Sequence, residues 1–420
     1  MAPLTVLAGP NSSGKSSLMQ PLLLLKQTIE APYDPGSLLI DGPNVRFTAA
    51  NQLLARNPRG VGGDSFSVDV EIDASATVGV TYKKSLKRPI EAVEMRVRTR
   101  EAAELRFRPG MPHEEILTVL PENLRPLANM FGQNDRPVTW QVGRNRGFLR
   151  LQLTTGIDKT PLQLSGEFLQ INEQRLLLNH IRRIIHVPGL RGEPQRTQKT
   201  TAVGTEFPGT FESYVASVLN HWKENEQGKL RRVGTGLEKL GLTWGVDAAR
   251  VDDTRVEIRV GRLTHKSKSR ERDMVNIADV GFGVSQVLPV LVALQAAGRG
   301  QLVYVEQPEL HLHPRAQFAL AEILSDAIER GIRVTIETHS SLLLLGIQTL
   351  VAEGRIAHDA VSLNWFSRDV DGITKVTSAE LDGSGRFGNW PEDFDIVNLE
   401  AESRFLDAVD AHETKKVSSP

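Results

Sequence analysis

The sequence predicts an α/β protein with an antiparallel β-rich lobe and a helical insertion. Three observations predict this fold class. A short apolar strand at residues 2–8 leads into a glycine-rich loop and then a helical stretch. Apolar and polar side chains alternate with period two within residues 60–153, a pattern typical of half-buried antiparallel strands. From residue 275 onward helices and strands alternate, which indicates parallel βα units.

The composition limits the classes of function that the chain can serve. The 420 residues have a formal net charge of -1 and include no cysteine. This balance creates no overall field that would draw the protein to nucleic acid or to a membrane. The missing thiols exclude disulfides, thiolate zinc sites and cysteine nucleophiles. No segment reaches the roughly 18 apolar residues that span a bilayer, so we expect a cytoplasmic protein with no membrane partner.

The N-terminal half is expected to pass from helix to strands. A helix is predicted over about residues 16–29, and Pro21 should kink or loosen it because proline lacks a backbone donor. The segments "FSVDVEID" and "FLRLQL" carry the alternating pattern and are predicted strands. Between them, "PHEEILTVLPENLRPLANMF" is predicted to form short helices that end at its prolines.

The C-terminal half follows a more regular pattern. Helical stretches are expected at about 166–185 and 209–240, and strands return from residue 255. The alternating region then predicts helices at 285–297, 314–330 and 341–353, strands at 301–306 and 333–338, and a last helix at about 399–411. We divide the chain into 1–60 and 271–360 as the two parts of one head, 61–165 as a β-rich lobe, 166–270 as a helical insertion returning to the head, and 361–420 as a tail domain.

The glycine-rich loop matches G-x-x-x-x-G-K-[ST] at residues 9–16. It lies between a strand and a helix, where inward-pointing N–H groups and the helix N-terminus bind phosphate oxygens. Lys15 is expected to reach the β- and γ-phosphates, and Ser16 to hold Mg²⁺. The alternative is a turn that binds nothing. The nucleotide-binding residues expected here are Gly9, Pro10, Asn11, Ser12, Ser13, Gly14, Lys15, Ser16 and Ser17.

Two further elements indicate a nucleotide site. Glu306 ends the apolar strand "LVYV", where a carboxylate can hold Mg²⁺ through water. Kinases and small GTPases place this element much nearer the loop, so the long gap argues against both. His339 follows the next strand, and its imidazole can contact a γ-phosphate or the attacking water.

A third element precedes the acidic strand. In "VGFGVSQVLP", Gly281 and Gly283 permit close backbone approach, and Ser285 is expected to begin a helix whose N-terminus suits a phosphate.

The segments "GPNSSGKSS", "VGFGVSQVLP", "VYVEQPELHLHP" and "IETHSS" together resemble the ABC-type ATPase superfamily. Within it, the chain resembles the SMC-like and overcoming-lysogenization-defect-like branch of bacterial AAA-family ATPases. The tail "LDGSGRFGNWPEDFD" resembles a short C-terminal domain of unknown function found in one bacterial subgroup. Relatives carry one more strand before the loop strand, so either this edge is shortened or the true start lies upstream.

The resemblance implies a P-loop ABC-type head that binds and hydrolyses ATP with Mg²⁺. Two heads would dimerise, or assemble further, with residues 9–17 of one subunit facing Gly281, Phe282, Gly283 and Ser285 of the other. We expect an ATP-gated switch for a separate nuclease-type effector, in bacterial DNA maintenance or antiviral (anti-phage) defence. The alternative is an ATP-held scaffold that sequesters a partner nuclease or binds DNA with little hydrolysis.

The superfamily's acidic strand usually ends in two carboxylates, the first for Mg²⁺ and the second as general base. Here Gln307 occupies the second position, and an amide cannot accept a proton near neutral pH. It can still orient water, while Glu309 or His339 takes the proton; alternatively, the subgroup uses another base. The expected catalytic residues are Glu306, Gln307 and His339, and the expected turnover is slow.

Two remaining patterns leave alternatives open. His311 and His313 lie near Glu309 and could hold a metal, although an interface turn after the acidic strand is the preferred interpretation. The basic runs "RVRTR", "RNRGFLR" and "HKSKSRER" could contact DNA, but such runs are more often solvated strand faces or hairpin tips. An acidic cluster for a nuclease site is missing after His339, which argues against a nuclease.

Overall fold

The computed structural model describes residues 1–55, 62–72, 76–85, 90–99, 104–120, 125–126, 138–155, 172–265, 273–388 and 403–409. The chain divides into two compact units. The head unit comprises Met1–Lys15, Val187–Val203 and Glu212–Pro420, and the lobe unit comprises Ser16–His186 and Gly204–Phe211.

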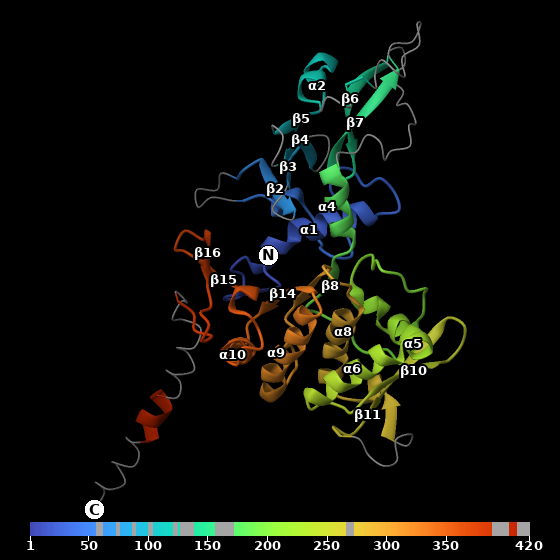
Figure 1. Cartoon of the computed structure of the whole chain (residues 1–420), viewed down its shortest axis with the longest axis vertical. Coiled ribbons are helices and arrows are strands. Elements are labelled where there is room, and N and C mark those ends of the chain that lie inside the picture. Colours follow the sequence, from blue (N-terminus) through green and yellow to red (C-terminus); the bar gives the residue numbers. More distant parts are fainter. Residues whose placement is uncertain are drawn as a thin grey trace, which may run out of the picture. The chain divides into compact units, whose positions relative to one another are not determined.

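A mixed sheet is the centre of the head unit (Figure 1). Its strand order in the described residues is β16 (Thr374–Ala379), β15 (Val361–Arg368), β1 (Leu4–Ala8), β14 (Arg333–Thr338), β13 (Leu302–Glu306) and β8 (Ile185–Val187). Strand β1 pairs in parallel with both β14 and β15, and β13 pairs in parallel with β14. Apolar side chains on both faces are buried, as expected for central parallel strands. The carboxyl ends of β1, β13 and β14 therefore lie at one edge.

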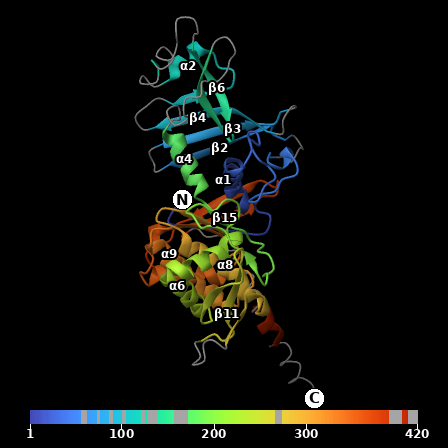
Figure 2. The same ribbon diagram turned by 90° about the vertical axis from the view of Figure 1, so that its right-hand side faces the viewer.

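Helices cover this sheet. Helix α8 (Phe282–Ala296) contacts β13, and α9 (Pro314–Glu329) contacts β14. Helix α9 also packs against α10 (Ser341–Ala352). Helix α8 is apolar on nearly all sides and lies between the sheet and α6 (Gln227–Lys239), so nearly its whole length is buried. Figure 2 shows α6, α8 and α9 close together.

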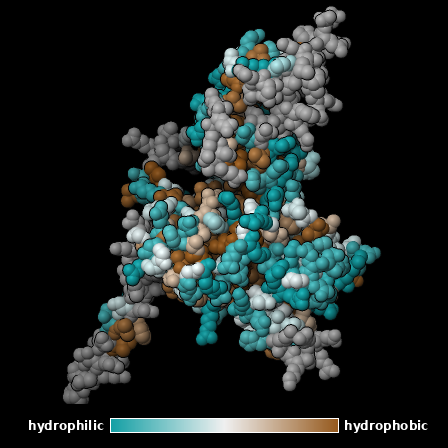
Figure 3. Space-filling view, in the orientation of Figure 1, coloured by the Kyte–Doolittle hydropathy of each residue, from teal (hydrophilic) through white to brown (hydrophobic). Residues whose placement is uncertain are grey.

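A smaller antiparallel sheet completes the head unit. It contains β10 (Val246–Arg250), β11 (Arg255–Gly261), β12 (Met274–Asn276) and β9 (Gln198–Lys199), and α5 (Val215–Asn225) packs against it. On the face shown in Figure 3, the side chains around α5 and β10 are almost all hydrophilic. Short 3₁₀ helices are η2 (Phe211–Tyr214), η3 (Ile277–Asp279) and η4 (His358–Ala360).

The lobe unit begins with the helix that follows the glycine-rich loop. Its elements are α1 (Lys15–Glu30), η1 (Ala50–Gln52), the antiparallel sheet β2 (Ser65–Ile72), β3 (Ala76–Lys83), β4 (Glu91–Thr99) and β5 (Leu105–Phe107), then α2 (His113–Val119), the hairpin β6 (Val138–Asn145) and β7 (Phe148–Thr155), and α4 (Asn172–Arg182). Its core gathers Tyr82, Trp140 and Phe148, which are almost completely buried.

The structure confirms the α/β class and most of the predicted elements. The strand at 333–338 has the expected bounds, and those at 2–8 and 301–306 differ by at most two residues. Residue 185 lies in strand β8, not at the end of a helix, and α1 continues as one helix through Pro21. Residues 127–131 and 166–171 of the predicted helical segments, and most of the run "HKSKSRER", lie outside the described residues. Of the predicted last helix, residues 403–409 are described and helical. The five domain boundaries remain predictions.

Strands β15 and β16 were not anticipated from the sequence. Strand β15 lies beside β1 in the main sheet and pairs with β16 in an antiparallel hairpin. Within the described residues, no helix is both long and apolar enough to cross a bilayer.

Candidate functional site

The glycine-rich loop between β1 and α1 has a backbone conformation that depends on its glycines. Gly9 and Gly14 have φ angles of 139° and 103°, in the region that L side chains rarely adopt. A Cβ on Gly9 would lie 2.2 Å from the carbonyl oxygen of Phe366 in β15. Glycine is therefore required at position 9 for the loop to approach the neighbouring strand.

Lys15 is turned into this loop. Its Nζ donates hydrogen bonds to the carbonyl oxygens of Gly9, at 3.0 Å, and Pro10, at 2.7 Å. Burial lowers the pKa of Lys15, and the nearby charge of Glu337 opposes that shift. The two carbonyls fix the ammonium group at the mouth of the loop, while Ser16 and Ser17 follow it in the first turn of α1.

Strand β16 holds the opposite side of the loop. Thr374 Oγ1 donates a hydrogen bond of 2.9 Å to the carbonyl oxygen of Ser13. A Cβ on Gly14 would lie 2.8 Å from the same hydroxyl oxygen. Thr374 is a site residue that the motif could not indicate, because it lies 361 positions from Ser13 in sequence.

A pocket of about 430 Å³ opens beside the loop. It is lined by Asn11, Gln307, Glu309, Leu310 and His339. These residues meet because each follows the carboxyl end of β1, β13 or β14, and parallel strands end at the same edge of a sheet. The structure thus brings together Asn11, Gln307 and His339, which the sequence predicted as site residues.

Backbone geometry and local charge shape this pocket. Gln307 has a φ of 43°, an uncommon left-handed conformation for a residue other than glycine, which marks a sharp turn directly after β13. Burial, followed by the positive charge of Lys15, lowers the pKa of His339. The imidazole of His339 is therefore neutral near pH 7, in a form that can accept a hydrogen bond.

Glu309 has an unusual carboxylate. Its Oε1 accepts hydrogen bonds of 2.8 Å from Thr338 Oγ1 and from the backbone N–H of His339. Its Oε2 is buried and has no hydrogen-bond partner among the described residues, and Glu309 is only 9% exposed. Burial raises the pKa of Glu309, and the hydrogen bond from His339 is the largest opposing effect.

Glu306 lies at the end of β13, as predicted. Its Oε2 accepts a hydrogen bond of 3.0 Å from the backbone N–H of Gly189. Among the described residues, no three His, Cys, Asp or Glu side chains gather as a metal cage. Mg²⁺ usually needs only one or two carboxylates beside substrate phosphates, so a carboxylate such as that of Glu306 is a suitable ligand type, and the metal role of Glu306 and Ser16 remains a prediction.

Arg191 supports the end of β13 from the loop after β8. Its guanidinium donates hydrogen bonds to the carbonyl oxygens of Gln286, at 3.0 Å, and Glu306, at 2.7 Å. Burial lowers the pKa of Arg191 to about 10, with Glu212 the largest opposing charge. Arg191 lies in "VPGLRGEPQR", a segment to which the sequence analysis assigned no role.

The start of α8 corrects one prediction. The helix begins at Phe282 with Gly281 as its N-cap, so Ser285 lies inside the first turn and does not begin the helix. Its hydroxyl donates a hydrogen bond of 3.0 Å to the carbonyl oxygen of Phe282. Gly281 is extended and marks the end of the preceding loop, so the helix begins three residues before the predicted position. The N-terminal donors are therefore presented at 281–283.

The two histidines after β13 have local roles. His313 is the N-cap of α9, and its Nδ1 accepts a hydrogen bond from the backbone N–H of Arg315. The ring of His311 lies 6.1 Å from that of Phe282, measured between centroids. These contacts favour the interpretation that this segment is a structural turn and not a metal site.

The basic runs within the described residues are largely engaged with other groups. Arg96 donates to both carboxylate oxygens of Asp69, and Arg144 donates to Asp34 at 2.8 Å. These pairs support the interpretation of "RVRTR" and "RNRGFLR" as solvated strand faces. Most of "HKSKSRER" lies outside the described residues, and DNA contact remains a prediction.

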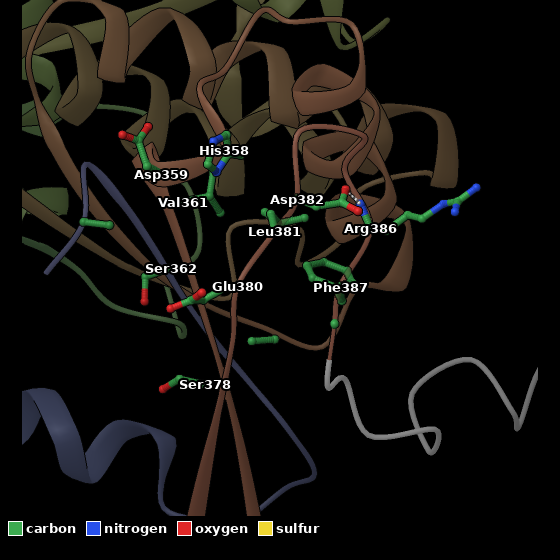
Figure 4. A pocket seen from close by; sticks show the side chains of 13 residues that line it. His358, Asp359, Val361, Ser362, Ser378, Glu380, Leu381, Asp382, Arg386 and Phe387 are labelled. Atoms are coloured by element: carbon green, nitrogen blue, oxygen red, sulfur yellow. Dashed lines mark hydrogen bonds between the residues drawn. The ribbon is translucent and has the colours of Figure 1, made fainter.

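A larger pocket, of about 890 Å³, lies beside β15, β16 and the turn after them (Figure 4). Asp382 points toward Arg386 in this view, and its Oδ1 accepts hydrogen bonds from the backbone N–H groups of Ser384 and Arg386. Hydrogen bonding, chiefly from the Ser384 side chain, lowers the pKa of Asp382. This carboxylate stabilises its own turn, so we assign the pocket no chemistry.

Comparison with known protein families identifies the chain. A family described as "AAA domain, putative AbiEii toxin, Type IV TA system" matches residues 4–109 and 196–345, more than half of the sequence. The chain belongs to this family. This match confirms the expected membership among AAA-family ATPases. An AAA domain is an ATP-binding domain of the ATPase class. The matched ranges include the glycine-rich loop, Glu306 and His339.

Solved structures with a distant likeness to this AAA-family chain are SMC head domains. An SMC head bound to the C-terminal winged-helix domain of ScpA is 10% identical, with 90% of each chain covered and a TM-score of 0.43. The Pyrococcus furiosus SMC head bound to the C-terminal domain of ScpA is 10% identical, with 97% of this chain and 93% of that chain covered and a TM-score of 0.41. The Thermotoga maritima SMC head is 9% identical over 90% of each chain, with a TM-score of 0.31. A search of curated proteins found no match.

Proposed function

We propose that this chain binds and slowly hydrolyses ATP, and that the nucleotide holds two heads together in a dimer that switches a separate effector protein. The observation that carries this proposal is the pocket in which Asn11 of the glycine-rich loop meets Gln307, Glu309 and His339. Triphosphate groups bound by residues 9–17 would place their terminal phosphate beside side chains that can orient or activate water.

The residues of one head have distinct parts in this proposal. Backbone N–H groups of the loop and Lys15 bind the phosphates, which positions the γ-phosphate. Mg²⁺, held by Ser16 and Glu306, would neutralise phosphate charge. Gln307 orients the attacking water through its amide, and His339 donates or accepts a hydrogen bond beside it.

The start of α8 supports the dimer. Gly281 provides no side-chain cap for the helix, and Phe282 is 54% exposed beside it. An uncapped helix N-terminus with donors facing solvent suits the phosphates of a nucleotide bound to a second head. In this dimer, residues 281–285 of one subunit cover residues 9–17 of the other, so ATP stabilises the dimer and hydrolysis releases it.

The effector is proposed to be a nuclease-type protein, and the setting bacterial DNA maintenance or anti-phage defence. The family description names a toxin–antitoxin system but no effector, so the effector and the setting rest on the resemblance of the sequence.

The test measures ATP binding, ATP hydrolysis and sedimentation for wild type and Lys15→Ala. Wild type should bind ATP, sediment as a dimer with ATP, and turn over well below the roughly 10 per second that is typical of enzymes. Lys15→Ala should lose binding and dimerisation together. Lys83→Ala, which removes an exposed lysine in β3, is the matched control. Nucleotide-independent assembly of wild type would contradict the switch.

The second candidate is an ATP-held scaffold with little hydrolysis, and the amide of Gln307 at the position of the usual general base favours it. The same measurements separate the two. A scaffold keeps its ATP-dependent dimer for hours and releases no phosphate, whereas a switch releases phosphate and the dimer together.

A further inference from the structure

We propose that the carboxylate of Glu309 accepts the proton of the water that attacks the γ-phosphate of ATP. This inference rests on the proposed function, because it needs ATP bound at the glycine-rich loop. It assigns the role of general base to a residue three positions beyond Glu306, in the turn after β13, while Gln307 only orients the water.

The geometry supports Glu309 as the proton acceptor. Hydrogen bonds from Thr338 and from the His339 backbone hold Oε1, so the side chain has a defined orientation. This leaves Oε2, a buried oxygen to which no described residue donates, in a residue that lines the pocket with Asn11 and Gln307. A buried acceptor without a donor is costly, and a water in the pocket would satisfy it.

Electrostatics favour proton uptake at Glu309 over His339. A protonated Glu309 is neutral, and burial favours that form, so its pKa is raised and it is a better base than an exposed carboxylate. Protonation of His339 would instead create a second positive charge near Lys15, which disfavours it. The other groups that act on the charge of Glu309 are Thr338, through its hydrogen bond, and Arg191, through its positive charge.

The proposed step balances as follows. The water oxygen forms a bond to the γ-phosphorus while one of its protons moves to Glu309 Oε2. The bond between the γ-phosphorus and the bridging oxygen breaks, and its electron pair stays on the β-phosphate of ADP. Inorganic phosphate and ADP are released, and Glu309 returns its proton to solvent.

The test uses the full chain and the variants Glu309→Gln and Glu322→Gln. Glutamine retains an oxygen for the two hydrogen bonds but cannot take a proton. Glu322, a partly exposed residue of α9 that pairs with Lys239, is the matched control. We expect Glu309→Gln to lower the single-turnover hydrolysis rate by about 100-fold or more. ATP affinity should stay within about twofold, and sedimentation should show a longer-lived ATP dimer.

The pH profile is the second readout. Wild-type hydrolysis should fall in acid with a midpoint above the ordinary 4.5 of a glutamate, because protonated Glu309 is no longer a base. Glu309→Gln should lose this acid limb, whereas Glu322→Gln should keep it. Should Glu309→Gln fail to fold, Glu309→Asp decides the question: it retains a carboxylate, so we expect a slower rate with the acid limb preserved.

Three outcomes would overturn the inference. A hydrolysis rate of Glu309→Gln within threefold of wild type shows that another group takes the proton. An equal loss of ATP affinity and rate makes Glu309 a binding or structural residue. Wild type that binds ATP but never hydrolyses it refutes the hydrolytic part of the proposed function, and this result is visible before any variant is made.

Discussion

The guanidinium of Arg191 donates a hydrogen bond of 2.7 Å to the backbone carbonyl of Glu306. The same side chain donates to the carbonyl of Gln286 in α8, and Gln286 Nε2 donates back to the carbonyl of Arg191. Arg191 therefore connects helix α8, which begins at Phe282, to the end of the acidic strand. Since it is only 7% exposed, water cannot readily replace these contacts.

The first prediction concerns this connection. Arg191→Met should lower the free energy of unfolding by about 3 kcal/mol, because the carbonyls of Gln286 and Glu306 lose a charged donor inside the protein. Urea unfolding measures the change. Arg196→Met, on the same loop, removes an exposed ion pair with Asp279 and should cost much less stability, because solvent screens that pair. Equal losses for both variants would contradict a special role for Arg191.

The second prediction concerns the contact between β16 and the glycine-rich loop. Thr374→Val has nearly the same shape but cannot donate to the Ser13 carbonyl, so the loop loses one restraint. We expect ATP affinity to fall about fivefold, the equivalent of about 1 kcal/mol for one neutral hydrogen bond. Equilibrium binding of a fluorescent ATP analogue measures it. Thr377→Val, at an exposed position of the same strand, should leave affinity unchanged.

The third prediction concerns Gln307. Gln307→Glu places a second carboxylate at the end of β13, so hydrolysis should rise by at least about tenfold and the ATP dimer should dissociate sooner. Phosphate release and sedimentation measure the two effects. Gln295→Glu, at the far end of α8, is the control. Slower hydrolysis in Gln307→Glu would show that the amide itself is needed to orient the water.

The fourth prediction follows from the raised pKa of Glu309. The native protein holds this proton more tightly than the unfolded chain, so stability falls as pH rises from 4.5 through the higher native pKa. Glu309→Gln removes the ionisable group and should raise the melting temperature at pH 8. The gain should shrink as the pH approaches 4.5.

Thermal unfolding followed by circular dichroism tests this pH dependence, with Glu322→Gln measured in parallel. A gain of the same size at every pH would mean that the substitution acts through packing, not through the charge of Glu309.

Local sequence was enough to predict the parallel strands β1, β13 and β14 and the position of the glycine-rich loop. The conformation of the loop depends largely on its own residues. Gly9 and Gly14 adopt positive φ angles, and Lys15 donates hydrogen bonds to carbonyls of the same loop. The start of α8 was misplaced by three residues, because the serine pattern drew attention to Ser285 while the extended Gly281 is the actual cap. Strand β15 was missed, and it forms a central part of the sheet next to β1.

The sequence by itself determined that a glycine-rich loop, an acidic strand end and a glycine-rich helix start occur in one AAA-family chain, since each is a short motif that depends on adjacent residues. Only the tertiary structure decided which side chains surround the loop. Thr374 reaches the loop, and Arg191 and Glu309 reach the end of β13, because the order of strands brings distant segments together. The burial that removes a hydrogen-bond partner from Glu309 Oε2 depends on that packing, and no spacing within the chain encodes it.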